Sequence, residues 1–196
     1  MTTTHLLYLH GFRSSPQSAK AQRLQRHIED TRPHVVWSAP QLPASPRQAA
    51  DLLLQTTRSW AGLPPESVAV VGSSLGGFYA SWVAQQLRCK SVMINPSTTP
   101  WVTLEQHLGE QTAWHNPEES FFFRPEYLEE LQALNVNGQP PTAPQLLIAA
   151  MGDEVLHWQD MVARYPAAQL LLDEGSDHAL SNFENYLPQI DKFLGW

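Results

Sequence analysis

The sequence predicts an α/β domain with a six-stranded, mostly parallel sheet, helices on both faces and a small cap insertion. Three observations support this class: six short apolar runs recur along the chain, helix-start residues stand between them, and one connection is much longer than the others. The length of 196 residues suits one domain with its own core. The single Cys89 cannot form an internal disulfide.

Six runs of strand length have consecutive apolar residues rather than an alternation of apolar and polar residues. Continuous apolarity is typical of strands that are buried on both faces, as in a parallel sheet covered by helices. The predicted strands cover residues 5–11, 35–40, 67–74, 91–97, 145–153 and 169–176.

Residues that favour helix starts separate these runs. Ser14-Ser15-Pro16 and Ser45-Pro46 each place a hydroxyl before a proline that suits the first helical turn, so we expect two helices to begin there. A third helix should begin after Ser74. A last helix should begin at about Ser181, with Pro188 bending it.

The connection between the fourth and fifth runs is longer than one crossover needs. It covers residues 97–143, is rich in aromatic side chains and contains a predicted short helix over 125–134. A segment this aromatic is too apolar to be disordered. We therefore expect a small cap over one end of the sheet.

Composition and charge exclude several classes of partner. The chain has 12 Lys and Arg against 19 Asp and Glu and a net charge of −7, with no basic stripe, so we expect no nucleic-acid partner. No apolar run approaches the ~18 residues of a membrane span. The start MTTTHLLYLHGF lacks a basic n-region, and with one cysteine this favours a cytoplasmic protein. No metal-ligand spacing is evident, so we expect neither a metal nor a cofactor.

The strongest local signal is Gly72-Ser73-Ser74-Leu75-Gly76, which fits G-x-S-x-G between a predicted strand and a predicted helix. Such a turn strains its middle residue, and its glycines are needed because a Cβ would collide with strand and helix. Ser74 is the candidate nucleophile, at a helix N-terminus that favours a developing anion. The alternatives are an ordinary βα turn or a phosphate loop, but Phe78 and Tyr79 stand where a P-loop needs Lys and Ser or Thr.

A serine nucleophile needs a base that a third group holds in place. Asp153 follows the fifth run and His178 the sixth, in the chain order Ser, acid, His that is typical of hydrolases. All three would meet at the carboxyl edge of the sheet, where α/β sheets bind ligands. Glu154 competes as the acid, although the shorter Asp153 suits a strand tip better, and Asp177 is badly placed for the His178 ring. The alternative for His178 is a surface loop histidine.

Backbone amides should converge near Ser74, because negative charge develops on the carbonyl oxygen in the transition state. Leu75 should supply one amide. Phe12 should supply the second, from the loop after the first strand, where Gly11 lets the backbone turn inward. The alternative is a simple strand-ending turn, with His10 as a packing or hydrogen-bonding residue.

Aromatic residues of the cap are candidates for a substrate pocket, although they could equally hold the cap together. The candidates are Trp101, Trp114, Phe121 and Phe122. Three histidines could line the cleft from the cap side, and we expect them to be spectators: His107, His115 and His157.

Several of these motifs occur in order along the whole chain: HGF, Pro40-Gln41-Leu42-Pro43, GSSLGG, INP, MGDEVL and GSDHAL. They resemble the YqiA-like esterase family of small bacterial α/β-hydrolases. The resemblance implies a minimal α/β-hydrolase fold, with Ser74 as nucleophile, Asp153 as acid, His178 as base and the Phe12 and Leu75 amides as oxyanion donors.

The predicted activity is therefore that of a serine esterase. It would hydrolyse small-molecule acyl esters, or thioesters, through an acyl-enzyme and without a cofactor. The alternatives are a catalytically idle scaffold that binds a small ligand, and a hydrolase that cleaves amide or C–C bonds.

Overall fold

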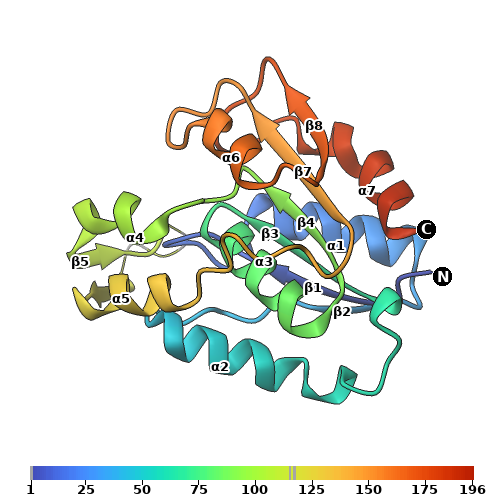
Figure 1. Ribbon diagram of the computed structural model, residues 1–196, viewed down its shortest axis with the longest axis horizontal. Coiled ribbons are helices and arrows are strands. Elements are labelled where there is room, and N and C mark those ends of the chain that lie inside the picture. Colours follow the sequence, from blue (N-terminus) through green and yellow to red (C-terminus); the bar gives the residue numbers. More distant parts are fainter. Residues whose placement is uncertain (1, 115, 117) are drawn as a thin grey trace.

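The computed structural model describes residues 2–114, 116 and 118–196. A six-stranded sheet lies at its centre, with strand order β2-β1-β3-β4-β7-β8 and every neighbouring pair parallel (Figure 1). The strands are β1 (His5–Leu9), β2 (Val36–Ser38), β3 (Val68–Ser73), β4 (Lys90–Ile94), β7 (Gln145–Ala150) and β8 (Gln169–Asp173). Each predicted run overlaps one of these strands, with β4 beginning one residue before its run, so the predicted α/β class is confirmed.

Both faces of the four central strands are buried, as the continuous apolar runs predict. The prediction is wrong for the two edge strands, since Val36 in β2 is 47% exposed and Leu170 in β8 is 41% exposed. In β1, Leu6 and Tyr8 pack into one core and Leu7 and Leu9 into the other, and all four are at most 1% exposed. The sheet is therefore the middle layer of a three-layer structure.

Helices form the two outer layers (Figure 1). One face is covered by α1 (Ala19–Thr31) and α7 (Leu187–Leu194). The other face is covered by α2 (Pro46–Thr56), α3 (Leu75–Leu87) and α6 (Trp158–Arg164). Short 3₁₀ helices cover Arg58–Trp60, Pro65–Ser67, Glu105–His107 and Phe183–Tyr186.

The first predicted helix starts differ in outcome. The Ser45 hydroxyl accepts a hydrogen bond from the Gln48 amide at 3.2 Å, so α2 begins at the predicted place. The Ser15 hydroxyl instead accepts a bond from the Gln17 amide at 3.1 Å and closes a local turn. The helix then begins at Ala19, so the earlier predicted start is wrong.

The C-terminal helix also differs from the prediction. A 3₁₀ segment, Phe183–Tyr186, precedes α7, which begins at Leu187. Pro188 therefore lies in the first turn of α7, where its missing N–H breaks no helical hydrogen bond, and it starts the helix rather than bending it.

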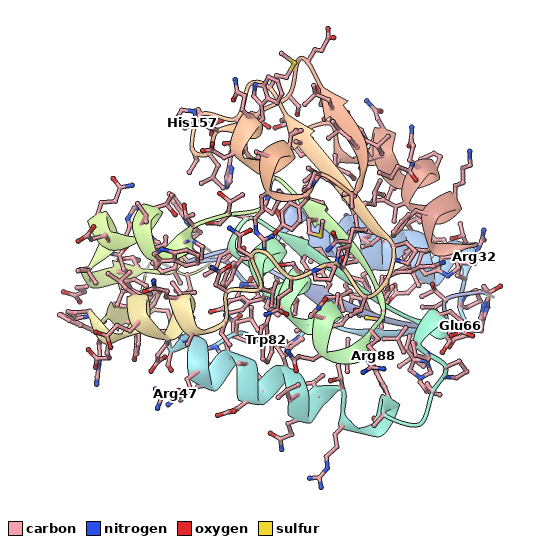
Figure 2. All side chains as sticks on the ribbon, viewed as in Figure 1. Arg32, Arg47, Glu66, Trp82, Arg88 and His157 are labelled. Carbon is pink, nitrogen blue, oxygen red and sulfur yellow. The ribbon has the colours of Figure 1, made fainter. Side chains whose placement is uncertain are left out.

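The segment 97–143 lies at the opposite end of the molecule from the two termini (Figure 1). Arg32 and Glu66, which precede β2 and β3, lie toward the termini, whereas His157, which follows β7, lies away from them (Figure 2). The segment therefore lies at the carboxyl end of the strands. It contains α4 (Pro100–Thr103), an antiparallel hairpin of β5 (Gly109–Thr112) and β6 (Ser120–Phe123), and α5 (Glu126–Ala133).

The helix α5 matches the short helix predicted over 125–134, but the hairpin was not predicted. α5 packs against α2 and α4, which ties the segment to the body of the domain. Within the described residues, no helix combines the length and the apolar character needed to cross a membrane.

Candidate active site

Ser74 occupies the turn between β3 and α3 in a backbone conformation that residues other than glycine rarely adopt, with φ at 57° and ψ at −122°. Surrounding hydrogen bonds hold this conformation. The Ser74 amide donates to the Ile94 carbonyl at 3.0 Å, and its carbonyl accepts from Gly77 at 2.9 Å and Ser97 at 3.1 Å. Strained conformations of this kind cost on the order of 1–3 kcal/mol and persist only where the structure enforces them.

The flanking glycines allow this turn to approach its neighbours. A Cβ on Gly72 would lie 2.0 Å from the Gly76 carbonyl oxygen, and a Cβ on Gly76 would lie 2.0 Å from the Leu9 carbonyl oxygen. Both contacts are with backbone atoms, which cannot move aside as the end of a flexible side chain can. Glycine is therefore present where the end of β1, the end of β3 and the start of α3 meet.

A hydrogen-bonded chain links Ser74, His178 and Asp153. The Ser74 Oγ lies 3.1 Å from His178 Nε2, and His178 Nδ1 lies 2.8 Å from Asp153 Oδ2. The Asp153 side chain is fully buried, and its Oδ1 accepts bonds from the Val155 and Leu156 amides at 2.8 Å each. An ionised carboxylate only accepts, so Nδ1 carries the ring proton and Nε2 is left to accept the serine proton.

The two competing acids lie elsewhere. Glu154 accepts a bond from the His178 backbone amide at 3.0 Å, so it contacts the loop rather than the ring. Asp177 accepts from the Ser181 amide at 2.9 Å and its hydroxyl at 2.7 Å. Of the three acids considered, Asp153 is the one that meets the His178 ring.

Asn95 joins three parts of the site and was not singled out in the sequence. It is fully buried directly after β4 and has a positive φ of 41°. Its Nδ2 donates to the Asp177 and His178 carbonyls at 3.0 Å each, and its Oδ1 accepts from the Ala150 amide at 2.8 Å. The sequence signal that could have identified Asn95 is its position as an asparagine near the carboxyl end of a predicted strand.

Asp173, at the end of β8, holds the other side of the His178 loop. Its Oδ1 accepts from the Gly175 and Ser176 amides at 2.9 Å each, and its Oδ2 accepts from Asn182 and the Tyr186 hydroxyl at 2.6 Å each. Burial opposes ionisation, but these four bonds outweigh it and hold the pKa of Asp173 below its ordinary value. The ionised Asp173 carboxylate therefore holds the start of the His178 loop by hydrogen bonds.

Lys20 on α1 reaches the same loop. Its ammonium donates to the Ala179 carbonyl at 2.5 Å. Burial lowers the pKa of Lys20 to about 8, although the charges of Asp177 and Asp153 oppose this shift. A cation therefore lies close to the segment that presents His178.

The two expected oxyanion donors lie beside Ser74. Phe12 and Leu75 line the same cavity as Ser74 and His178. Within the described part of the chain, neither amide donates a hydrogen bond to another residue. The Phe12 and Leu75 amides can therefore donate hydrogen bonds to a ligand atom in the cavity at Ser74.

The loop that carries Phe12 is held from outside the site. His10 Nε2 accepts from the Leu42 amide at 3.0 Å, and His10 Nδ1 lies 2.9 Å from the Gly11 carbonyl. The Nδ1 therefore carries the proton, and the ring joins the loop to the segment before α2. This is the hydrogen-bonding role considered for His10.

Arg13 ties the same loop to the hairpin. Its Nε donates to the Thr112 carbonyl at 2.6 Å, and its own carbonyl accepts from the Trp114 amide at 2.7 Å. The guanidinium lies 4.4 Å from the centroid of the Trp114 ring. The hairpin is therefore anchored directly beside the Phe12 amide.

The cavity at Ser74 has a volume of about 330 Å³. Trp114, 72% exposed, lines it, and Phe121 lines a neighbouring cavity. Trp101 packs against Phe78 in the core and, like the exposed Phe122, lines neither of these two cavities. Of the histidines expected as spectators, His107 lines the cavity at Ser74, His157 lines a separate one of about 60 Å³, and His115 lies outside the described residues.

Among the residues that the structure describes, no three His, Cys, Asp or Glu side chains lie together in a way that could hold a metal ion. The titratable groups of the site are instead engaged with one another or with backbone atoms.

The sheet, its helices and the turn at Ser74 define an α/β-hydrolase fold. The chain is similar to Est1E from Butyrivibrio proteoclasticus, with a TM-score of 0.76 and 16% identity over 97% of this chain and 86% of that one. It is also similar to mouse alpha/beta hydrolase domain-containing protein 10, with a TM-score of 0.73 and 17% identity over 100% and 91% of the two chains.

A third similar structure is the esterase domain of a Rhodothermus marinus protein, with a TM-score of 0.71 and 20% identity over 98% of this chain and 85% of that one. At these identities the likeness shows the fold. The model of the uncharacterised protein family UPF0227, the YqiA family, matches residues 5–195, and the chain belongs to this family.

Proposed function

We propose that this protein is a serine hydrolase that cleaves carboxylic esters or thioesters. The observation that carries the proposal is the hydrogen-bonded chain from Ser74 Oγ through the His178 ring to the buried Asp153 carboxylate. A serine hydroxyl is a weak nucleophile unless a positioned base takes its proton. The similar domain from Rhodothermus marinus is described as an esterase domain, which favours an ester as the substrate.

In the proposed reaction, Ser74 Oγ attacks the carbonyl carbon while His178 Nε2 takes its proton. Negative charge moves to the carbonyl oxygen, where the Phe12 and Leu75 amides donate to it. The resulting imidazolium is stabilised by Asp153 and gives its proton to the leaving oxygen or sulfur, so the acyl group remains on Ser74. A water that His178 deprotonates then attacks the acyl-enzyme and releases the acid.

A fluorophosphonate probe tests this proposal, because it forms a bond only with an activated serine. The wild type should be labelled on Ser74, and Ser74→Ala should not be labelled or hydrolyse p-nitrophenyl esters. Ser73→Ala is the matched control, since Ser73 is the adjacent buried serine and lies outside the triad. Equal labelling of wild type and Ser74→Ala would refute the assignment.

A catalytically idle scaffold is the second candidate. It predicts a folded wild-type protein that the probe does not label and that turns over no ester. The two outcomes are therefore separated by the same experiment.

A further inference from the structure

A second cavity, of about 320 Å³, lies under the β5–β6 hairpin. It shares three lining residues with the cavity at Ser74: Phe12, Arg13 and Leu75. The backbone amides of Phe12 and Leu75 are the proposed hydrogen-bond donors to the oxyanion. The second cavity therefore begins at the point where the reacting carbonyl would lie.

The buried wall of this cavity is mostly aliphatic and aromatic, with His10 as its buried polar residue. Leu42, Tyr79, Phe123 and Leu131 line it, and the last three are at most 2% exposed. Its polar lining residues include Gln41 and Glu119, both exposed, so that side faces solvent. Such a cavity suits an apolar group with a polar or solvated far end.

The Phe12 ring borders both cavities. Its centroid lies 5.6 Å from that of His107, which lines the cavity at Ser74. The centroids of Phe121 and Phe123 lie at 5.8 Å and 5.1 Å, and both residues line the second cavity. Phe12 therefore lines both cavities and contacts aromatic residues of each.

Proton transfer sets which half of an ester lies on which side. The leaving oxygen must receive its proton from His178 Nε2, and His178 lines the cavity at Ser74 but not the second one. The alcohol half must therefore lie in the cavity at Ser74. The acyl half is bonded to the carbonyl carbon away from the leaving oxygen, which leaves the second cavity, bordered by the side chains of Phe12 and Leu75, as the space for it.

We propose that the second cavity binds the acyl chain of the substrate, and that the Phe12 ring, which borders both cavities, sets the size of acyl group accepted. This proposal rests on the proposed ester hydrolysis. Each cavity alone is at the small end of the range for ligand sites, and the two together have about twice the volume of either. Short acyl groups stop before the ring, and longer ones pass it.

Variants that fill or open the second cavity test the proposal. Ala44→Leu and Leu131→Phe add atoms to its wall, and Phe12→Leu makes the side chain that borders both cavities smaller. The matched control is Leu128→Phe, because Leu128 is on the same helix α5 and packs against the same core but lines neither cavity. Circular dichroism establishes that each variant is folded.

The substrates are p-nitrophenyl esters with acyl chains of increasing length, followed by acetyl esters of increasingly large alcohols. The filling variants should lower kcat/KM for the octanoyl ester at least tenfold and change the acetyl ester less than twofold. A tenfold loss corresponds to lost burial of about two methylenes. Phe12→Leu should raise the octanoyl-to-acetyl ratio about tenfold, and because both esters use the same amides, this ratio is independent of the basal rate.

Equal effects on the acetyl and octanoyl esters, or a dependence on alcohol size in place of acyl size, would overturn the proposal. Binding of octanoate, measured by calorimetry on Ser74→Ala, gives a readout without turnover. We expect Ala44→Leu in that background to weaken octanoate binding at least tenfold and Leu128→Phe to leave it unchanged. Absence of turnover in the wild type would refute the proposed function, whereas unchanged octanoate binding in Ala44→Leu would refute the assignment of the cavity.

Discussion

Asn95→Asp is the change that most directly tests how the His178 loop is held. The new side chain has nearly the same size, and one of its oxygens can still accept from the Ala150 amide. The other oxygen replaces the nitrogen that donates to the Asp177 and His178 carbonyls at 3.0 Å each. A carboxylate oxygen would then face two carbonyl oxygens in a fully buried place.

The expected loss of stability follows from these contacts. Two carbonyl groups lose their donor, and an unsatisfied buried polar group costs about 1–3 kcal/mol, so the loss is about 2–6 kcal/mol before the buried charge is added. The total stability of a domain is about 5–15 kcal/mol. Burial and the facing carbonyls raise the pKa of the introduced carboxyl, so its cost is present above that pKa and falls as the pH is lowered and one O–H donor is regained.

Urea unfolding at pH 5.5 and pH 8 measures this cost, with Asn95→Ala as the uncharged comparison and the exposed Asn137→Asp as the control for charge. If Asn95 positions His178, both Asn95 variants should also lower kcat, and the limiting rate of fluorophosphonate labelling of Ser74, at least tenfold, with KM changed less. Asn95→Asp alone should recover stability at the lower pH. Variants with wild-type stability and a wild-type labelling rate would refute the reasoning.

Three further changes have expected outcomes. Gly72→Ala should abolish folding or cost more than about 4 kcal/mol in urea unfolding, because its Cβ would lie 2.0 Å from the Gly76 carbonyl oxygen, whereas Gly62→Ala, with nothing within 4 Å, should be near neutral. Asp153→Asn should keep the fold by circular dichroism and lower kcat about 10⁴-fold, because its amide would face His178 Nδ1 and move the ring proton to Nε2; a loss below tenfold would contradict the tautomer argument. Asp173→Asn should lose stability at neutral pH. Because the pKa of Asp173 is below its ordinary value of 3.8, the difference in unfolding free energy from wild type should be fully present above about pH 4 and shrink as the pH falls further; a constant difference from pH 2 to 7 would be inconsistent with that shift.

Much of the fold can be predicted from the sequence because its signals are local. The buried strands are continuously apolar, and the turn at Ser74 needs two glycines at fixed positions. The start of α1 could not be placed because Ser15 closes a turn instead of capping the helix, and the helix begins after Ser18, whose side chain makes no capping hydrogen bond. The β5–β6 hairpin could not be predicted because β5 has no apolar run and the hairpin depends on distant packing, with Phe123 buried against Phe12.

The contribution of Asn95 could not be predicted because it depends on the order of strands in the sheet. The neighbouring strands β3, β4, β7 and β8 each end at the site, and they are followed by Ser74, Asn95, Asp153 and His178 respectively. The His178 loop therefore has to cross the ends of β7 and β4 to reach Ser74. Asn95 lies at the end of β4, and it hydrogen-bonds both to the loop above and to Ala150 at the end of β7. The position between nucleophile and acid thus requires a side chain that both donates and accepts, which an asparagine amide does.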